Sequence, residues 1–383
     1  MKVTFAGGGT GGHLYPAIAI ADALLERAAR NSEPMRVQFL GARDRLEAKI
    51  VPAAGYEMRF VPARALVGSG WLARVGAVAV NALGAVVAMR LLVRHKPDVL
   101  IASGGYVCFP AVLAARILRA MRLLRAPIVL LEINAQPGLT NRVLAPLVDE
   151  VWGTTDAGSP VFAGKYRATG IPIRPALRAL PGRDAAAERL GLDPNKRTVL
   201  AMGGSQGARS VNDAILAVVA RDALPAGWQV LHLCGERDYE RVMNLRRGAP
   251  QTTAIIVRPY LADPADAYAS ADVVVARAGA STLGELAYAG LPAVLVPYPH
   301  AADDHQRANA QRFARAGAAV IIEDRDLSGA SLGAALTSLI EPNNLERMRR
   351  AARSLAKPDA IEAIMQRIDA LTGASSTGAA YGK

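Results

Sequence analysis

The sequence predicts an α/β protein made of two Rossmann-like domains that face each other across a cleft. Short apolar strand patterns alternate with helical patterns along the chain, which predicts parallel sheets covered by helices on both faces. In addition, a glycine-rich turn follows an apolar strand at the start of each half, at residues 7–13 (the first glycine turn) and 203–208 (the second glycine turn). A strand–turn–helix unit of this kind presents backbone N–H groups and a positive helix end to an anion, usually a phosphate.

The elements are expected where short apolar runs give way to helical periodicity. In the first half, strands are expected at 2–6, 36–40, 98–102, 127–131 and 150–153, and helices at 15–30, 44–54, 75–94, 110–124 and 139–145. In the second half, strands are expected at 198–202, 229–233, 254–257, 272–275, 293–296 and 318–322. Helices are expected there at 208–222, 237–246, 264–270, 281–289, 304–316, 328–340 and 343–355.

The length of 383 residues suits two or three domains. Prolines make 171–183 the expected linker, so we expect a first domain over 1–175 and a second over 176–358. A terminal helix at 359–371 is expected to return to the first domain, and a disordered tail is expected over 372–383.

Cysteine usage and the start of the chain indicate a reducing cytoplasmic compartment. The two cysteines, Cys108 and Cys234, lie one in each half and form neither a disulfide framework nor a zinc site. The chain starts directly on a strand, so no signal peptide is expected. The apolar run 75–89 is interrupted and shorter than the roughly 20 residues that a membrane span needs, so it predicts a buried or half-buried helix.

The net charge of +12 is unevenly distributed. Residues 1–175 hold 21 basic and 11 acidic side chains, against 24 and 22 in the remainder, and the excess lies at 59–125 (the basic stripe). Arginines interleaved with leucine and tryptophan suit an anionic membrane surface, where each basic residue contributes about 1 kcal/mol to binding. The alternative is a generally basic, solvated surface. Nucleic acid is not expected as a partner, because no known DNA- or RNA-binding motif is present.

The first glycine turn matches the dinucleotide fingerprint through Gly7, Gly9 and Gly12, so a nicotinamide or flavin enzyme has to be considered. However, the second strand runs into Gly41 without the acidic residue that such enzymes use for the ribose, and Asp44 lies in the next turn. Neither glycine turn continues into the Gly-Lys-Ser/Thr of a Walker phosphate loop.

Two residues in the first half are candidates for catalysis. His13 lies at a helix start, which favours a neutral imidazole that can accept a proton from an attacking hydroxyl, although it could also be a capping or packing residue. Glu132 ends an apolar strand, where a charged side chain needs a partner or a task. Its alternative role is that of a structural, hydrogen-bonded carboxylate.

The second half offers a matching set of polar residues. Ser281 and Thr282 can cap a helix and bind phosphate, while Glu285 either completes a capping box or accepts bonds from ribose hydroxyls. The histidines and aspartates of 300–305 resemble metal ligands, but a polar loop and helix start, with Gln306 and Asn309 holding sugar hydroxyls, is the favoured interpretation.

Taken together, these motifs resemble the MurG family of cell-wall glycosyltransferases. The matching elements span about residues 7 to 310 in the family's order: Gly8-Gly9-Thr10-Gly11-Gly12-His13, Ser103-Gly104-Gly105-Tyr106, Glu132-x-Asn134-x-x-Pro137-Gly138, Gly203-Gly204-Ser205-Gln206-Gly207-Ala208, Arg277-x-Gly279-Ala280 and His305-Gln306-x-x-Asn309. The resemblance implies the two-domain GT-B fold and inverting transfer of N-acetylglucosamine from UDP-N-acetylglucosamine to the C4 hydroxyl of undecaprenyl-pyrophosphoryl-N-acetylmuramyl-pentapeptide, without metal or other cofactor. It also implies a peripheral enzyme of peptidoglycan synthesis at the cytoplasmic face of the inner membrane, with room for contacts to other cell-wall synthesis proteins.

The resemblance also assigns roles to individual residues. Glu285 would hold the ribose, the backbone at Leu261 the uracil, the turn at Ser205 the donor diphosphate and Gln306 the sugar. The first glycine turn would face the acceptor pyrophosphate, with His13 as the base and Glu132 as a helper. The donor contacts implied in this way are Thr10, Gly11, Gly12, Asn134, Arg174, Ser205, Leu261, Ala280, Ser281, Thr282, Leu283, Gly284, Glu285 and Gln306.

Two departures from the family pattern, Ile133 and Ile171, replace polar residues and put neighbouring hydrogen bonds in doubt. Two other functions stay open. A UDP-N-acetylglucosamine 2-epimerase would share the fold and the donor but has no need of the basic stripe. A membrane-associated nucleotide-binding protein without catalysis would have no need of His13, Glu132 and Gln306.

Overall fold

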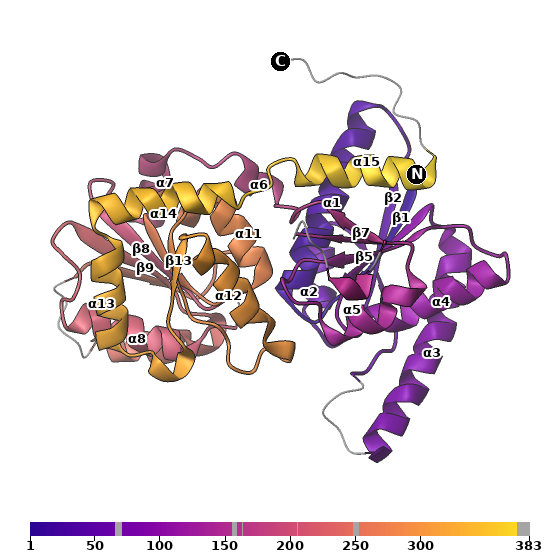
Figure 1. Ribbon diagram of the computed structural model, residues 1–383, viewed down its shortest axis with the longest axis horizontal. Helices are drawn as coiled ribbons and strands as arrows, with labels where there is room; N and C mark the ends of the chain where they lie inside the picture. The colour runs from indigo at the N-terminus through magenta and orange to yellow at the C-terminus, as the bar shows by residue number, and fades with distance from the viewer. Residues whose placement is uncertain (66–70, 155–158, 163, 205, 248–252, 374–383) are drawn as a thin grey trace. The chain divides into compact units, whose positions relative to one another are not determined.

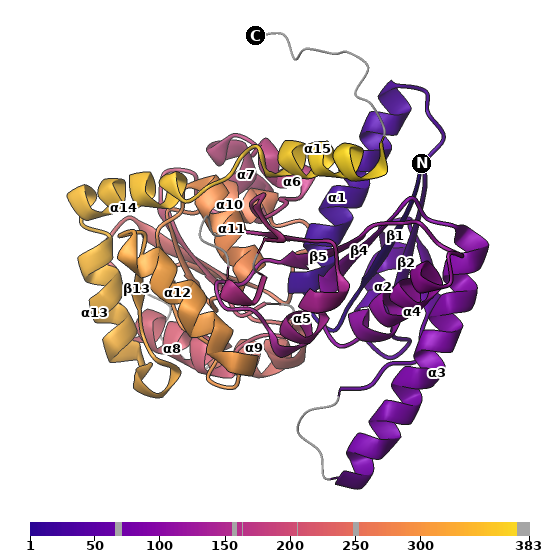
Figure 2. The ribbon, with the colours of Figure 1, turned by 45° about the vertical axis from the view of Figure 1, so that its right-hand side comes forward.

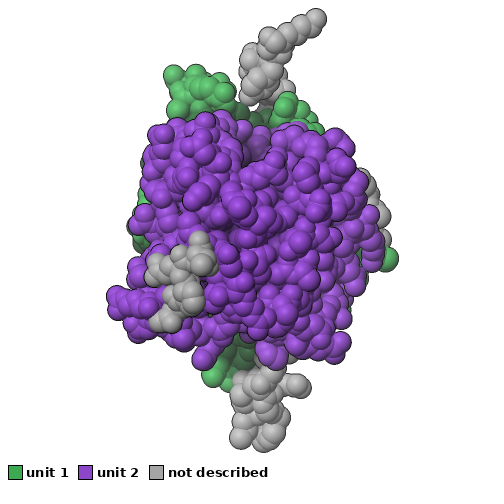
Figure 3. Space-filling model, turned by 90° about the vertical axis from the view of Figure 1, so that its left-hand side faces the viewer, with its two compact units in different colours: residues 1–133, 137–174, 359–383 green, residues 134–136, 175–358 purple. Residues whose placement is uncertain are grey.

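The computed structural model describes residues 1–65, 71–154, 159–162, 164–204, 206–247 and 253–373. The chain divides into two compact units, which Figure 3 shows in different colours. Unit 1 consists of Met1–Ile133, Pro137–Arg174 and Asp359–Lys383, and unit 2 of Asn134–Gln136 and Pro175–Pro358. In each unit a parallel sheet is packed between helices (Figure 1).

The described part of unit 1 contains a parallel sheet with the strand order β3-β2-β1-β4-β5-β6-β7. The strands are β1 (Lys2–Gly7), β2 (Arg36–Gly41), β3 (Glu57–Phe60), β4 (Val99–Gly104), β5 (Ile128–Glu132), β6 (Glu150–Gly153) and β7 (Tyr166–Ala168). The helices are α1 (Gly11–Arg30), α2 (Glu47–Ala53), α3 (Trp71–His95), α4 (Cys108–Ala120), α5 (Leu139–Leu144) and α15 (Ala360–Thr372). The strand order reverses between β1 and β4, and such a switch point is where open α/β sheets bind ligands at the carboxyl ends of their strands.

Unit 2 repeats this plan with the strand order β10-β9-β8-β11-β12-β13 among its described residues. The strands are β8 (Arg197–Met202), β9 (Trp228–Leu233), β10 (Ile255–Arg258), β11 (Val273–Ala276), β12 (Ala293–Leu295) and β13 (Ala319–Ile321). The helices are α6 (Pro175–Arg178), α7 (Arg183–Leu190), α8 (Arg209–Ala220), α9 (Tyr239–Arg247), α10 (Ala265–Ser270), α11 (Ala280–Ala289), α12 (His305–Arg315), α13 (Gly329–Leu339) and α14 (Pro342–Ser354). Here the order reverses between β8 and β11, so the second glycine turn follows a strand at the switch point, as the first one does in unit 1.

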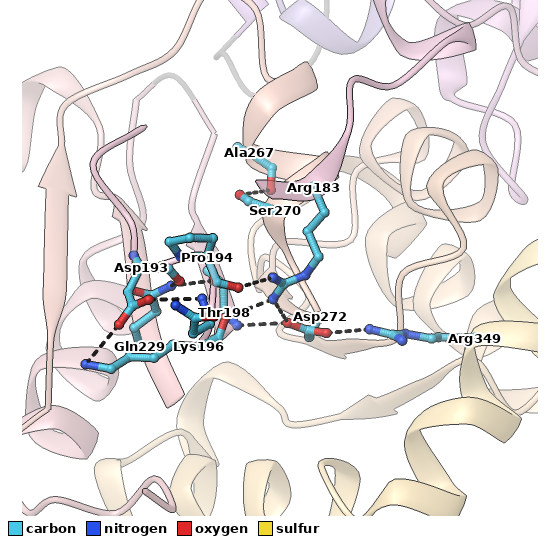
Figure 4. Close-up of polar contacts among 11 residues, drawn as sticks. Arg183, Asp193, Pro194, Lys196, Thr198, Gln229, Ala267, Ser270, Asp272 and Arg349 are labelled. Carbon is cyan, nitrogen blue, oxygen red and sulfur yellow. Dashed lines mark hydrogen bonds and ion pairs between the residues drawn. The ribbon is translucent and has the colours of Figure 1, made fainter. Parts of the chain in front are cut away.

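Unit 2 is fastened at the amino end of its sheet by one buried carboxylate, that of Asp272 (Figure 4). It accepts hydrogen bonds from Arg183 Nη2 at 2.8 Å, Arg349 Nη2 at 2.6 Å and the backbone N–H of Thr198 at 2.9 Å. These partners come from α7, α14 and β8, so one side chain ties two helices to the sheet.

Helix α15 belongs to unit 1 although its sequence follows unit 2. Arg367 Nε donates to the buried Glu150 at 3.1 Å, and Arg27 of α1 forms a 2.8 Å ion pair with Asp369. Both pairs join α15 to segments from the first half of the chain.

Helix α3 is apolar on both sides and packs along α4 (Figures 1 and 2). Its stretch Val75–His95 is, among the described residues, the one helix long and apolar enough to cross a membrane, and 33% of it is buried. On the protein side, the Asn81 amide pairs with the backbone of Arg64 at 2.9 and 3.2 Å. Away from this contact, Val75, Val78 and Leu83 of the same helix are more than half exposed. The partial burial agrees with the half-buried helix expected from the sequence. The length argument was wrong, however, because the apolar helix continues past residue 89 to His95 and is long enough to cross a membrane.

Several expected boundaries needed correction. Strands β3 and β7 were not predicted, because both lie at the edges of the sheet and carry no continuous apolar run. Helices α6 and α7 occupy parts of the expected linker 171–183, and Pro175 is tolerated because it lies at the first helical position. The expected tail lies outside the described residues from 374 onward.

Candidate active site

The first glycine turn connects β1 to α1 at the switch point of unit 1. Gly9 has a φ of +90°, which favours glycine, and the extended Thr10 precedes α1 without capping it through its side chain. The Thr10 side chain is exposed and Gly11 and Gly12 are the first residues of the helix. The turn therefore presents a hydroxyl group and a helix N-terminus at the end of β1, as expected for an anion site.

His13 is held against the loop that follows β4. Its Nδ1 lies 3.0 Å from the carbonyl oxygen of Ser103, which can only accept, so Nδ1 donates and a neutral imidazole carries its lone pair on Nε2. A Cβ added at Gly104 would lie 2.5 Å from Nδ1, so glycine is needed where this loop passes the ring. The structure thus brings the first glycine turn and the Ser103–Tyr106 motif together and fixes the tautomer that a general base requires.

Glu132 is buried at the end of β5. Its Oε2 accepts from the Gly138 N–H at 3.1 Å and from Asn141 Nδ2 at 2.7 Å, so it fastens the start of α5. Asn141 was not recognised from the sequence, although it is itself buried. These bonds match the structural alternative for Glu132.

Arg174 lies in unit 1 beside the first glycine turn. Its guanidinium stacks 4.5 Å from the centre of the Tyr15 ring, and a Cβ at Gly11 would lie 3.1 Å from that same ring. Tyr15 was not predicted to take part in the site. It orients Arg174 through a cation–π contact.

The second glycine turn connects β8 to α8, and Ser205, a candidate residue, lies outside the described residues. Gly204 and Gly207 have φ angles of +80° and +76°. A Cβ at Gly207 would lie 2.3 Å from the carbonyl oxygen of Cys234, so this turn is pressed against the end of β9.

A buried polar network supports this contact, and the sequence did not reveal it. His232 Nε2 donates to Asn212 Oδ1 at 2.8 Å, and Asn212 Nδ2 donates to the Cys234 carbonyl at 2.9 Å and to Asp238 at 2.7 Å. Burial lowers the pKa of His232 to about 4, so the ring is neutral.

Glu285 lies on α11 and is nearly buried. Its Oε2 accepts a 2.8 Å hydrogen bond from the hydroxyl of Tyr268 on α10. The helix begins at Ala280 with Gly279 as its N-cap and no side-chain cap, so the capping roles considered for Ser281, Thr282 and Glu285 are wrong. Glu285 lies a turn deeper in the helix and is positioned by Tyr268.

The remaining α11 candidates differ in exposure. Ala280 and Leu283 are buried, whereas Ser281, Thr282 and Gly284 are partly exposed. Leu261, in the connection after β10, is also partly exposed.

The polar run before α12 forms a loop and helix start. Gln306 Oε1 accepts from the Tyr298 N–H at 3.0 Å. Asn309 Oδ1 accepts from the Ala135 N–H at 2.8 Å, and its Nδ2 lies 3.3 Å from Asn134 Oδ1. The structure therefore brings Asn134 and Asn309 together. Among the described residues, no group of three or more His, Cys, Asp and Glu side chains is arranged to hold a metal ion.

Arg277, just after β11, joins three segments of unit 2 through its guanidinium. Its guanidinium donates to Asp324 at 2.6 Å, to Ser210 Oγ at 3.0 Å and to the Pro297 carbonyl at 3.2 Å. Burial alone would raise the pKa of Asp324, but the bonds from Ser210 and Arg277 outweigh it and lower that pKa below its usual value. The Arg277 motif is therefore mainly structural here.

Two nucleotide-type units, each with a glycine turn at its switch point, form the two-domain GT-B fold expected from the sequence. Comparisons with known proteins confirm this fold and identify the chain as a glycosyltransferase. Residues 3–152 match the N-terminal domain of glycosyltransferase family 28 and residues 198–364 its C-terminal domain. A crystal structure of MurG from Acinetobacter baumannii is 29% identical with a TM-score of 0.74, covering 96% of this chain and 99% of that one.

Curated relatives narrow this class. The UDP-N-acetylglucosamine–N-acetylmuramyl-(pentapeptide) pyrophosphoryl-undecaprenol N-acetylglucosamine transferase of Moorella thermoacetica is 40% identical, covering 96% of this chain and 98% of the relative. The enzyme of the same name from Desulforudis audaxviator is 37% identical, covering 97% and 99%. The chain belongs to the MurG family of hexosyltransferases. Two more distant structures share the fold. One is the calicheamicin glycosyltransferase CalG4, at 16% identity with a TM-score of 0.68. The other is a putative UDP-N-acetylglucosamine 2-epimerase from Listeria monocytogenes, at 13% identity with a TM-score of 0.67.

Proposed function

We propose that this chain transfers N-acetylglucosamine from UDP-N-acetylglucosamine to the C4 hydroxyl of undecaprenyl-pyrophosphoryl-N-acetylmuramyl-pentapeptide, with inversion at the anomeric carbon, in peptidoglycan synthesis. The observation that carries this proposal is the 35–40% identity, over nearly the whole length of both chains, to relatives that bear this activity in their names. Both glycine turns of the family are present, one in each unit, which supports two separate diphosphate sites.

On the acceptor side, His13 acts as the general base. With Nδ1 donating to Ser103, the Nε2 lone pair takes the proton from the C4 hydroxyl as that oxygen attacks the anomeric carbon opposite the leaving UDP. Thr10 and the N-terminus of α1 meet the acceptor pyrophosphate. The two bonds of Glu132 to the start of α5 favour a positioning role over proton transfer for this residue.

On the donor side, unit 2 holds the nucleotide and stabilises the leaving group. The second glycine turn and the N-terminus of α8 receive the negative charge that develops on the diphosphate. Glu285 accepts from the ribose hydroxyls, Gln306 reads the sugar and the backbone at Leu261 meets the uracil. Arg174 and Asn134 add contacts to the sugar nucleotide.

The exposed face of α3, together with the basic stripe, holds the enzyme at an anionic membrane surface beside its lipid-linked acceptor. Val75, Val78 and Leu83 supply exposed aliphatic area, and Arg90 and Arg94 lie on the same helix. This proposal places the enzyme at the cytoplasmic face of the inner membrane. In a flotation assay, we expect strong binding to vesicles with anionic lipid; equal binding to neutral vesicles would contradict the electrostatic part.

The activity is tested by measuring UDP release from UDP-N-acetylglucosamine with and without the lipid-linked muramyl acceptor. We expect release that depends on the acceptor. A 2-epimerase would alter the sugar nucleotide without any acceptor, and a non-catalytic protein would bind UDP without turnover. Either result would refute the proposed transfer.

A further inference from the structure

A buried carboxylate lies directly behind the first glycine turn. Glu47, the first residue of α2, has no exposed surface. Its Oε2 accepts from the Gly9 N–H at 2.9 Å, and its Oε1 accepts from the N–H of Ala42, just after β2, at 3.0 Å. One side chain thus joins the carboxyl ends of β1 and β2.

Two glycines make room for this side chain. A Cβ at Gly8 would lie 2.1 Å from Glu47 Oε1, and a Cβ at Gly41 would lie 2.7 Å from Glu47 Cγ. In dinucleotide-binding folds, a glycine of this turn lets the backbone approach the ligand's pyrophosphate. Gly8, which is not one of the fingerprint glycines Gly7, Gly9 and Gly12, lets the backbone approach a side chain of the same chain.

The Gly8–Gly9 peptide is held from its other side as well. A Cβ at Gly105, which has a φ of +81°, would lie 2.5 Å from the Gly8 carbonyl oxygen. The Gly9 N–H and the Gly8 carbonyl belong to one planar peptide group. Glu47 on one side and Gly105 on the other therefore fix its orientation.

We propose that Glu47 is a positioning residue for the first glycine turn, the part of unit 1 proposed to bind the acceptor. Its charge-assisted bond turns the Gly9 N–H away from any ligand, so the acceptor pyrophosphate meets Thr10 and the start of α1 instead. The same bond fixes the path of the chain into His13. This inference rests on the proposed function, because it requires the first glycine turn to face the acceptor.

The first test compares Glu47→Gln with Glu150→Gln. The amide that Glu47→Gln introduces places an NH₂ group opposite one of the two backbone N–H groups, so one bond is lost. We expect kcat/KM for the lipid-linked acceptor to fall roughly 10- to 100-fold, while the Kd for UDP, the nucleotide that unit 2 is proposed to hold, changes less than about twofold. Glu150 is a similarly buried carboxylate of unit 1 at the amino end of the sheet, so its variant should lower Tm without changing the acceptor kinetics. Equal effects of the two variants, or unchanged acceptor kinetics in Glu47→Gln, would overturn the proposal.

A second test asks whether glycine is required at position 8 to make room for Glu47 or to let the substrate approach. Gly8→Ala should impair transfer strongly in the wild-type background but add little in the Glu47→Ala background, where the space is open. An equal loss in both backgrounds would mean that Gly8 is needed by the substrate and would overturn the proposal. Thermal unfolding and UDP binding verify that each variant is folded.

A third readout does not depend on turnover. Amide hydrogen exchange of the peptide that contains Gly9 should be faster in Glu47→Gln than in wild type and unchanged in Glu150→Gln. Unchanged exchange in Glu47→Gln would overturn the positioning role. Wild-type protein that releases no UDP with the acceptor would instead refute the proposed function, so the two failures are distinguishable.

Discussion

Removing the hydroxyl group of Tyr268 is expected to weaken the binding of the UDP sugar although Tyr268 itself is buried. Its hydroxyl donates a 2.8 Å bond to Oε2 of Glu285, the carboxylate proposed to hold the ribose. Tyr268→Phe keeps the ring, so packing against neighbouring residues is preserved. What is lost is the hydrogen bond from this hydroxyl to the Glu285 carboxylate, which helps to hold the carboxylate in one orientation.

The strength of that bond sets the upper limit on the loss of UDP affinity. A hydrogen bond to a charged group contributes about 1.5–3 kcal/mol. Tyr268 and Glu285 are only 2% and 8% exposed, so water does not readily replace the lost donor. If Glu285 loses its orientation entirely, the Kd for UDP rises by roughly 10- to 100-fold, because each 1.4 kcal/mol corresponds to a factor of ten.

Isothermal titration calorimetry with UDP measures this effect directly. Tyr288→Phe is a matched control, since its hydroxyl makes a long, 3.4 Å contact to the Arg178 carbonyl in the same unit and none to Glu285 among the described residues. We expect the control to bind UDP as wild type does. If Tyr268→Phe also binds normally while Glu285→Gln binds poorly, Glu285 does not depend on Tyr268 and the reasoning is refuted.

Three further predictions concern other parts of the molecule. His13→Ala should lower kcat by roughly 10²- to 10⁴-fold with little change in UDP binding, and near-normal turnover would disprove the base assignment. Because burial lowers the pKa of His232 from 6.5 to about 4, its stabilising contribution should be full above pH 6.5 and be lost as the pH falls towards 4, by up to about 3 kcal/mol. Unfolding of His232→Gln should therefore vary less with pH over that window; parallel curves would contradict this. Asp272→Asn removes the negative charge that Arg183 and Arg349 share, and it should lower the free energy of unfolding by about 3 kcal/mol in urea. An unfolding midpoint equal to that of wild type would contradict this.

The sequence was sufficient for those parts of the fold whose signals are local. The buried strands and the two glycine turns carry their patterns within a few residues, so the alternation of strands and helices was predicted correctly. The edge strands β3 and β7 were not, because pairing at an edge requires no apolar run. Candidates such as His13 and Glu132 came from local motifs, whereas Arg174 and Leu261 came only from the family resemblance. The structure brings His13 against the Ser103 loop and Asn134 against Asn309.

The residues that hold these candidates could not be found in the same way. Glu47 contacts Gly9 across 38 positions of sequence, and Tyr268 reaches Glu285 from a neighbouring helix. From the sequence alone, Glu47 and Tyr268 cannot be distinguished from ordinary helix residues. Their function depends on strand order and burial, which the spacing of side chains does not encode.

The place of α15 in unit 1 has a consequence for biosynthesis. Glu150 is made 217 residues before its partner Arg367, which corresponds to about 10 to 40 s at ribosomal rates. During that time the continuous segment Pro175–Pro358 of unit 2 is completed, so unit 2 can fold first, while the sheet of unit 1 holds a buried carboxylate that still lacks Arg367. A stable fragment of unit 1 alone should therefore require α15 to be fused directly behind residue 174.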